Sequence, residues 1–199
     1  MSEYLTPTTE LEAVNTILDV IGESPVSTLD NIEAADAAIA LNVLREVSRR
    51  VQKRGWHWNT EVDQTVTPDS ITGFINLAAN TVRVDSCTGG FGPSDILERG
   101  GRLYNRALST FIFTSPFMVT SVVLLAFADL PEAARDYIAI RAARTYQQRA
   151  LGSVTLNNFS KQEEDDALTA LQDAEADTQD FNIIRNNKSS ARLYRNRQP

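Results

Sequence analysis

Residues 54–59 read Arg-Gly-Trp-His-Trp-Asn and divide the chain into two kinds of sequence. Before them, apolar residues recur at intervals of three and four, which is the period of an amphipathic helix. From Trp56 to about Asp129 that period is lost, and short β-prone segments replace it. Gly55 is suited to end a helix, because glycine readily adopts the left-handed backbone that follows a last helical turn. The sequence therefore predicts a change from helix to strand at this step.

Two antiparallel helices are predicted before the step, as a helical hairpin over residues 1–55. Thr9 and Glu12 have the spacing of a capping box, while Gly22 and Pro25 stop the first helix. The second helix is predicted over residues 34–54. The apolar stripes are Leu11, Val14, Ile17, Leu18 and Ile21 in the first helix, and Ala37, Leu41, Leu44, Val47 or Ser48, and Val51 in the second.

A β-rich insertion is predicted over residues 56–129. The glycine pair Gly100-Gly101 lies inside an alternating stretch, residues 96–104, which is typical of a tight hairpin. Glycines and prolines at residues 88–93 predict a longer loop. The other β-prone segments are residues 62–66, 74–77, 82–84, 111–113 and 119–125.

A second helical pair is predicted over residues 130–180. Asp129 is the expected N-cap of a helix that runs to Gly152, and Ser160 with Glu163 is the expected capping box of the last helix. One face of that last helix is apolar (Ala167, Leu168, Leu171 and Ala174) and the other is strongly acidic. We therefore predict an α+β fold, in which an antiparallel helical bundle forms a hub that carries a β-rich insertion.

Charge is distributed unevenly along the chain. The net charge is −7, which argues against a protein that grips nucleic-acid phosphates in general. Residues 181–199 contain five bases and no acid, so residues 1–180 carry a net charge of −12. The basic C-terminal arm is either a solubilising tail or a segment that lies on the acidic body of another copy. Its bases are Arg185, Lys188, Arg192, Arg195 and Arg197.

The remaining composition points to a protein that is assembled in a reducing cytoplasm, is not exported and contacts no membrane. Cys87 is the single cysteine, so no disulfide within the chain is possible. The first residues have neither the basic nor the apolar region of a secretory signal. The longest apolar run, residues 122–128, is far shorter than the ~20 residues of a membrane helix.

No catalytic, metal or cofactor site is predicted. His57 is the single histidine and lies between two tryptophans, where packing is the more frequent role. The glycines at residues 89–92 lack the lysine of a phosphate-binding loop. The contiguous acids at residues 163–166 fan around a helix instead of converging on a metal ion. The alternative is a glycan hydrolase that uses two carboxylates, although nothing singles out a pair such as Glu98 with a partner near Tyr104.

The candidate interface residues have two interpretations each. The cations at the end of the second helix either complement the helix dipole or contact an acidic helix of a neighbour. The tryptophans either anchor a subunit interface or cap the bundle of their own chain. The acids near the start of the last helix either suit its dipole or meet a neighbour. The candidates are Arg49, Lys53, Arg54, Trp56, Trp58, Glu163 and Glu164, together with the five bases of the arm.

The order of several motifs resembles the tail tubular protein A family of short-tailed phages. Residues 10–18 read Glu-Leu-Glu-Ala-Val-Asn-Thr-Ile-Leu, and residues 21–29 read Ile-Gly-Glu-Ser-Pro-Val-Ser-Thr-Leu. The Arg-Gly-Trp step follows at residues 54–56. Further matches in the same order are Gly100-Gly101, Leu130-Pro131-Glu132 and the acidic residues 162–166.

This resemblance implies a structural protein of the virion tail and not an enzyme. It implies a dodecameric adaptor ring whose α-helical hub carries a β extension. In that family the ring docks beneath the portal, holds the tubular nozzle protein and offers positions for tail fibres. Its lumen passes DNA without binding a specific sequence.

Overall fold

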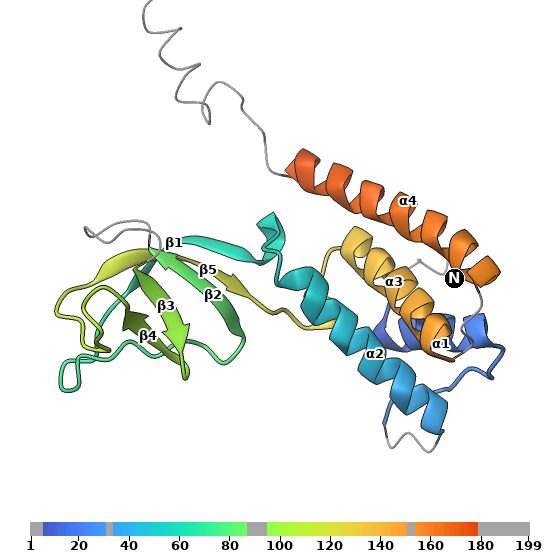
Figure 1. The fold of residues 1–199 in the computed structure, drawn as a ribbon, viewed down its shortest axis with the longest axis horizontal. Helices are drawn as coiled ribbons and strands as arrows, with labels where there is room; N and C mark the ends of the chain where they lie inside the picture. The colour runs from blue at the N-terminus through green and yellow to red at the C-terminus, as the bar shows by residue number, and fades with distance from the viewer. Residues whose placement is uncertain (1–5, 31–33, 87–94, 151–153, 179–199) are drawn as a thin grey trace, which may run out of the picture.

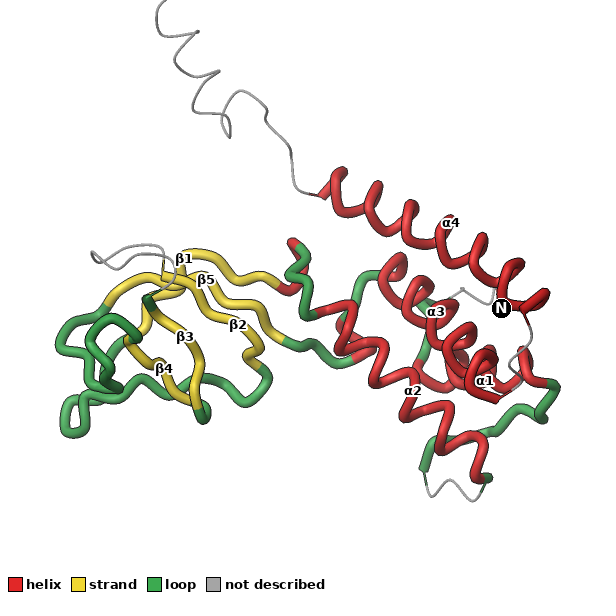
Figure 2. The backbone as a smooth tube through the Cα atoms, viewed as in Figure 1, coloured by secondary structure: helices red, strands yellow, loops and turns green. Residues whose placement is uncertain are grey.

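Helices and strands separate into two bodies, which we call the hub and the β unit (Figures 1 and 2). The computed structural model describes residues 6–30, 34–86, 95–150 and 154–178. The hub contains α1 (Glu10–Ile21), α2 (Ala35–Gln52), α3 (Glu132–Ala150) and α4 (Val154–Thr178). The β unit contains β1 (Thr60–Val66), β2 (Thr81–Ser86), β3 (Ile96–Arg99), β4 (Arg102–Asn105) and β5 (Phe117–Val123). The predicted α+β fold with a helical hub and a β-rich insertion is confirmed.

The hub is built around α3, which packs against α1, α2 and α4. The capping box of Thr9 and Glu12 at the start of α1 is present, and Gly22 ends the helix with a φ of 80°. The predicted apolar stripes of α1 and α2 supply most of the buried side chains that α3 covers. The largest fully buried ones in the hub are Val14, Ile17, Leu18, Leu44, Val47, Val51, Tyr137, Ile138 and Leu171.

Two predicted helix starts are wrong. Asp129 ends the short 3₁₀ turn Phe127–Asp129, and α3 begins after Pro131, whose carbonyl accepts the first helical hydrogen bonds. Ser160 lies inside α4, which already begins at Val154. Residues 154–159 contain no glycine or proline that would end a helix, so the backbone continues through the expected boundary.

The β unit consists of a three-stranded antiparallel sheet, in the order β1-β5-β2, and the β3-β4 hairpin. β5 lies in the centre of the sheet and is the most buried strand, because both of its edges are paired. The predicted hairpin is confirmed: Gly100 and Gly101 take φ values of 62° and 74°, which few other residues adopt easily. The separate core of the β unit contains Ile75, Val84, Ile96, Leu103, Phe113, Phe117 and Val119.

Two predicted strands, residues 74–77 and 111–113, are not strands. The carboxylate of Asp69 accepts hydrogen bonds from the backbone of Ile71 and Thr72, which folds the approach to Phe74 into a turn. The ring of Phe111 lies 6.5 Å from the ring of Phe74 and 4.9 Å from that of Tyr104. The aromatic side chains that made these segments look β-prone pack on one another without a continuous ladder. Only isolated bridges, such as Asn76 to Arg102, form there within the described residues.

Two buried amide side chains join the hub to the β unit, and we call them the junction clasp: Gln52 and Asn59. The amide of Gln52 bonds both backbone groups of Leu125, with its Oε1 2.7 Å from the N–H and its Nε2 3.1 Å from the carbonyl. The Nδ2 of Asn59 donates to the carbonyls of Gln52 and Val123, each at 2.9 Å. Both amides are at most 2% exposed. The clasp therefore ties the chain leaving the hub to the chain returning from β5.

The last helix is fixed to the hub along one side. Its buried Ala167 and Leu171 face the hub core, while the inward carboxylate of Glu164 forms ion pairs with Arg144 and with Arg141. Near the other end of α4, Glu175 accepts a hydrogen bond from the backbone N–H of His57. The helix is therefore held from its middle, at Glu164, to near its C-terminal end, at Glu175.

The substitution Asn59→Ala tests the junction clasp. It leaves the N–H of Trp56 and the carbonyls of Gln52 and Val123 without their buried partner. We expect the free energy of unfolding in urea to fall by about 2–4 kcal/mol. The matched control is Asn80→Ala, which removes an exposed amide bonded to the neighbouring Leu124 carbonyl and should cost less than about 1 kcal/mol. Equal losses for the two variants would contradict the role of the clasp.

Neighbouring glutamates of α4 provide a second test. Glu164 is 14% exposed and paired, whereas Glu163 is exposed and has no ion pair within the described part of the chain. We expect Glu164→Gln to lower the free energy of unfolding by about 1–2 kcal/mol and to increase hydrogen exchange in α4. Glu163→Gln should change it by less than about 0.5 kcal/mol. If Glu163→Gln lowers the free energy of unfolding as much as Glu164→Gln does, the ion pairs of Glu164 do not hold α4 on the hub.

Candidate assembly interface

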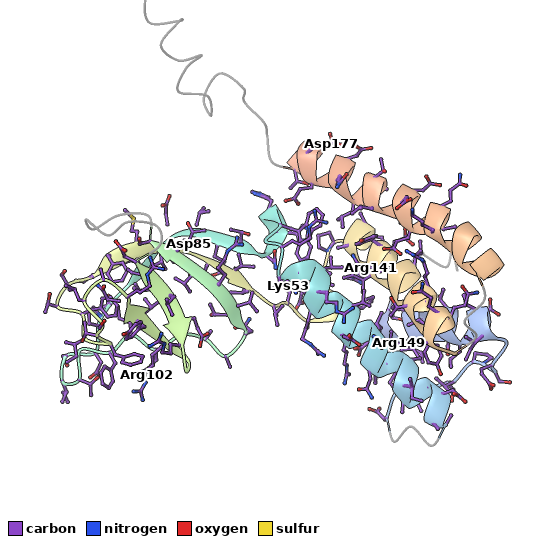
Figure 3. All side chains as sticks on the ribbon, viewed as in Figure 1. Lys53, Asp85, Arg102, Arg141, Arg149 and Asp177 are labelled. Carbon is purple, nitrogen blue, oxygen red and sulfur yellow. The ribbon has the colours of Figure 1, made fainter. Side chains whose placement is uncertain are left out.

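The cations at the end of α2 are only partly neutralised within the chain. Arg45 forms an ion pair with Glu10 at 3.0 Å. Farther along the same side, Arg49 and Lys53 are exposed, and no ion pair reaches them from the residues that the structure describes. Lys53 lies at the end of α2, where the hub meets the β unit (Figure 3). A helix C-terminus favours cations, but these two also present free charge to solvent.

Glu46 neutralises a different group of cations. Its carboxylate pairs with Arg50 in the same helix and with Arg149 of α3 at 3.0 Å. The hydrogen bond from Arg149, with help from the charges of Arg149, Arg50 and Arg49, holds the pKa of Glu46 below its usual value. Glu46 therefore stays ionised and serves the α2–α3 contact. The free charge at this end of the hub accordingly lies at Arg49, Lys53 and Arg54.

The tryptophans of the Arg-Gly-Trp step belong mainly to their own chain. Trp56 is 7% exposed, and its indole N–H donates to the carbonyl of Val51 at 2.9 Å. Trp58 stacks on it with a centroid separation of 6.3 Å and packs partly buried against the hub core. The guanidinium of Arg54 lies 5.3 Å from the Trp56 ring. The structure thus provides the bundle cap of the sequence analysis, while an interface role for the exposed part of Trp58 stays a prediction.

A cavity of about 300 Å³ lies beside the cations of α2. Arg45 and Arg49 border it on the helix, and Leu125 and Phe127 border it on the segment that returns from β5. Glu10, which pairs with Arg45, also lines the cavity. Arg49 has no ion pair among the residues that the structure describes, so its exposed guanidinium group is the cation at this cavity that an acidic side chain of a partner could reach.

The acids of α4 fall into an inward and an outward group. Glu164 faces Arg141 and Arg144, as described above, whereas Glu163 is exposed. The acidic face of this helix is predicted from the sequence, but only Glu163 and Glu164 are predicted interface candidates; Asp166, Asp173 and Asp177 are exposed on the same outward side as Glu163. The signal was present in their spacing, because offsets of 3, 10 and 14 residues from Glu163 return to one side of a helix. Asp177 lies at the C-terminal end of α4 (Figure 3).

The five bases of the C-terminal arm lie outside the described residues, as do Cys87 and the predicted loop at residues 88–93. Two further candidates from the sequence have local roles. Glu98 accepts a hydrogen bond from the backbone N–H of Gly101 at 2.8 Å and so helps close the β3-β4 turn. His57 is exposed, and its backbone N–H contacts Glu175.

The described part of the chain contains neither a candidate metal site nor a candidate membrane-spanning helix. In residues 6–30, 34–86, 95–150 and 154–178, no group of three His, Cys, Asp or Glu side chains is placed to hold a metal ion. In the same ranges no helix is long and apolar enough to cross a membrane.

Comparison with known proteins assigns the chain to a family. The family described as tail tubular protein matches residues 11–181, which include the hub helices and the whole β unit. Tail tubular protein A of Klebsiella phage KP34 is 30% identical over 156 residues, covering 78% of this chain and 81% of that protein. The resemblance seen in the sequence is thereby confirmed, and the glycan hydrolase alternative receives no support. The chain belongs to the tail tubular protein family and is a structural, non-enzymatic component of a phage virion tail.

Proposed function

We propose that this protein is one subunit of an adaptor ring between the head portal and the tail nozzle. The observation that carries the proposal is that the family match spans both bodies, hub and β unit, and so includes the clasp that joins them. An adaptor holds its two partners at a fixed distance and orientation, which requires that its own two bodies do not move relative to each other. The buried amides of the clasp provide that rigidity, because opening the junction would leave their backbone partners unpaired.

The ring forms by side-by-side contacts between identical subunits. Each subunit uses two different surfaces, and the rotation between neighbours closes the ring, with twelve copies implied by the family. The ring receives the portal above and the nozzle below and provides positions for tail fibres. Assembly takes place in the host cytoplasm.

The acidic body suits a conduit for DNA. Residues 1–180 carry a net charge of −12, so phosphates passing through the ring are repelled and the genome does not adhere to the wall. The basic arm, residues 181–199, lies on an acidic body of a neighbour or grips another tail protein. These charges act over about 10 Å at ordinary ionic strength, so assembly weakens with added salt.

Imaging a mixture with portal and nozzle proteins tests the function. We expect the full-length chain to form a collar between the two, visible in electron micrographs. Deletion of residues 182–199 should leave the thermal melting temperature within about 2 °C of the full-length value and greatly reduce collar formation. The absence of a collar with the full-length chain would overturn the adaptor role.

A matched variant separates the charge of the arm from its length. Replacing Arg185, Lys188, Arg192, Arg195 and Arg197 with glutamine keeps all residues and removes the five charges. Loss of collars with both variants indicates that charge is responsible. If the deleted chain assembles as well as the full-length chain, the arm has no role in assembly.

A further inference from the structure

The outward side of α4 is an acidic stripe, which we define as Glu163, Asp166, Asp173 and Asp177. All four side chains are exposed, and none forms an ion pair within the part of the chain that the structure describes. The stripe extends over fourteen residues, which is about 21 Å of helix. Four like charges on one side of a helix repel one another, so the isolated subunit gains nothing in stability from the arrangement.

The opposite side of the same helix is fully used by the subunit itself. Ala167 and Leu171 are buried, and the carboxylate of Glu164 is matched by Arg141 and Arg144. Among the described residues, the fold thus supplies cations for Glu164 and a backbone N–H for Glu175, whereas no ion pair reaches the outward acids. The contrast between the two sides points to a partner that supplies the missing cations.

A basic stripe on another part of the hub has the complementary properties. We define it as Arg49, Lys53 and Arg54, which are exposed and without an ion pair among the described residues. The cavity that Arg49 borders is lined by apolar side chains such as Leu125 and Phe127 as well as by polar ones, and its acid, Glu10, is already paired with Arg45. Arg54 also stacks on Trp56, so its position is restrained before a partner arrives.

We propose that the acidic stripe of one copy docks on the basic stripe of the next copy. This inference rests on the proposed ring and names the two surfaces that form its subunit contact. Within one subunit no ion pair joins the two stripes among the residues that the structure describes, and α3 lies between α2 and α4 and packs against both (Figure 1). The segment after α2 reaches α4 through the backbone N–H of His57, which bonds the inward Glu175 and no acid of the stripe. Surfaces of opposite sign on either side of α3 give a heterologous contact, and a closed ring is built from repeats of such a contact.

The second copy fits the acidic stripe better than the other candidates do. DNA is excluded by the sign of the charge. Both stripes lie on or at the end of helices, so their charges are held at a spacing that the fold fixes before a partner arrives. The arm of a neighbour is nevertheless a distinct occupant, and the experiment below separates it from the basic stripe.

Charge reversal in the full-length chain tests the pairing. The acid variant is Asp166→Lys with Asp173→Lys and Asp177→Lys, which changes the charge of the acidic stripe from −4 to +2. The base variant is Arg49→Glu with Lys53→Glu and Arg54→Glu, which changes the charge of the basic stripe from +3 to −3. A combined variant carries all six changes. The control is Asp165→Lys with Gln172→Lys, which alters exposed positions on the flank of α4 instead of its outward side. Circular dichroism and thermal melting verify that each variant folds.

Rings are counted in electron micrographs of mixtures with portal protein and by sedimentation velocity. We expect the acid variant and the base variant each to yield at least about tenfold fewer rings than the unsubstituted chain, because like charges then face each other. The combined variant should recover to within about threefold of the unsubstituted chain, since the signs again match. The flank control should form rings as the unsubstituted chain does.

The other possible outcomes distinguish a wrong pairing of the stripes from a wrong adaptor function. If both single-surface variants form rings normally, or the combined variant fails to recover, the pairing of the stripes is overturned. If only the acid variant fails, the occupant of the acidic stripe is another group, such as the arm, and the proposal is again overturned. If the unsubstituted chain forms no ring with portal protein, the proposed adaptor function itself fails.

Discussion

The constraint on which the structure depends is the hydrogen bonding of two buried amides, Gln52 and Asn59. The chain passes between hub and β unit twice, and each passage brings backbone groups into a region from which water is excluded. Such groups have to be paired, because a buried polar group without a partner costs on the order of 1–3 kcal/mol. The two amides bond Leu125 and Val123 of the return passage, and Asn59 also accepts from Trp56. One set of bonds therefore satisfies both passages and fixes their relative position.

The clasp matters because the two bodies have separate apolar cores. The core of the hub consists of helix side chains, and that of the β unit contains residues such as Val84, Leu103 and Val119. Burial of apolar area holds each body together without fixing the angle between them, since it has no direction. Hydrogen bonds are directional, and the junction supplies them. Two cores with a polar junction thus give a subunit with a defined shape, as the proposed adaptor role requires.

Much of this fold can be predicted from local sequence signals. The predictions that are wrong, and the features that were not predicted, depend on contacts between residues far apart in the sequence. The capping box of α1 and the Gly100-Gly101 hairpin depend on residues within a few positions, so the sequence predicts them correctly. The clasp joins Gln52 and Asn59 to groups 73 and 64 residues away, and no local rule specifies those partners. The two wrong strands contain aromatic residues that favour strands but here pack on one another. The sequence also does not distinguish inward Glu164 from outward Glu163, because that difference depends on where α3 lies.

The hub and the β unit differ in the kind of side chain that they expose, and this difference affects which forces can act between subunits. Among the described residues, the large apolar side chains that are exposed lie mostly in the β unit, and Ile39 is the single one in the hub. In the proposed ring, contacts made by the hub therefore depend chiefly on charge, which gives rapid encounter, selection against wrong registers and sensitivity to salt. Such a subunit would stay dispersed while copies are few and would join where a partner holds several copies close together. Under this proposal the opposite charges of the two stripes set the order in which neighbours meet, because only unlike surfaces attract.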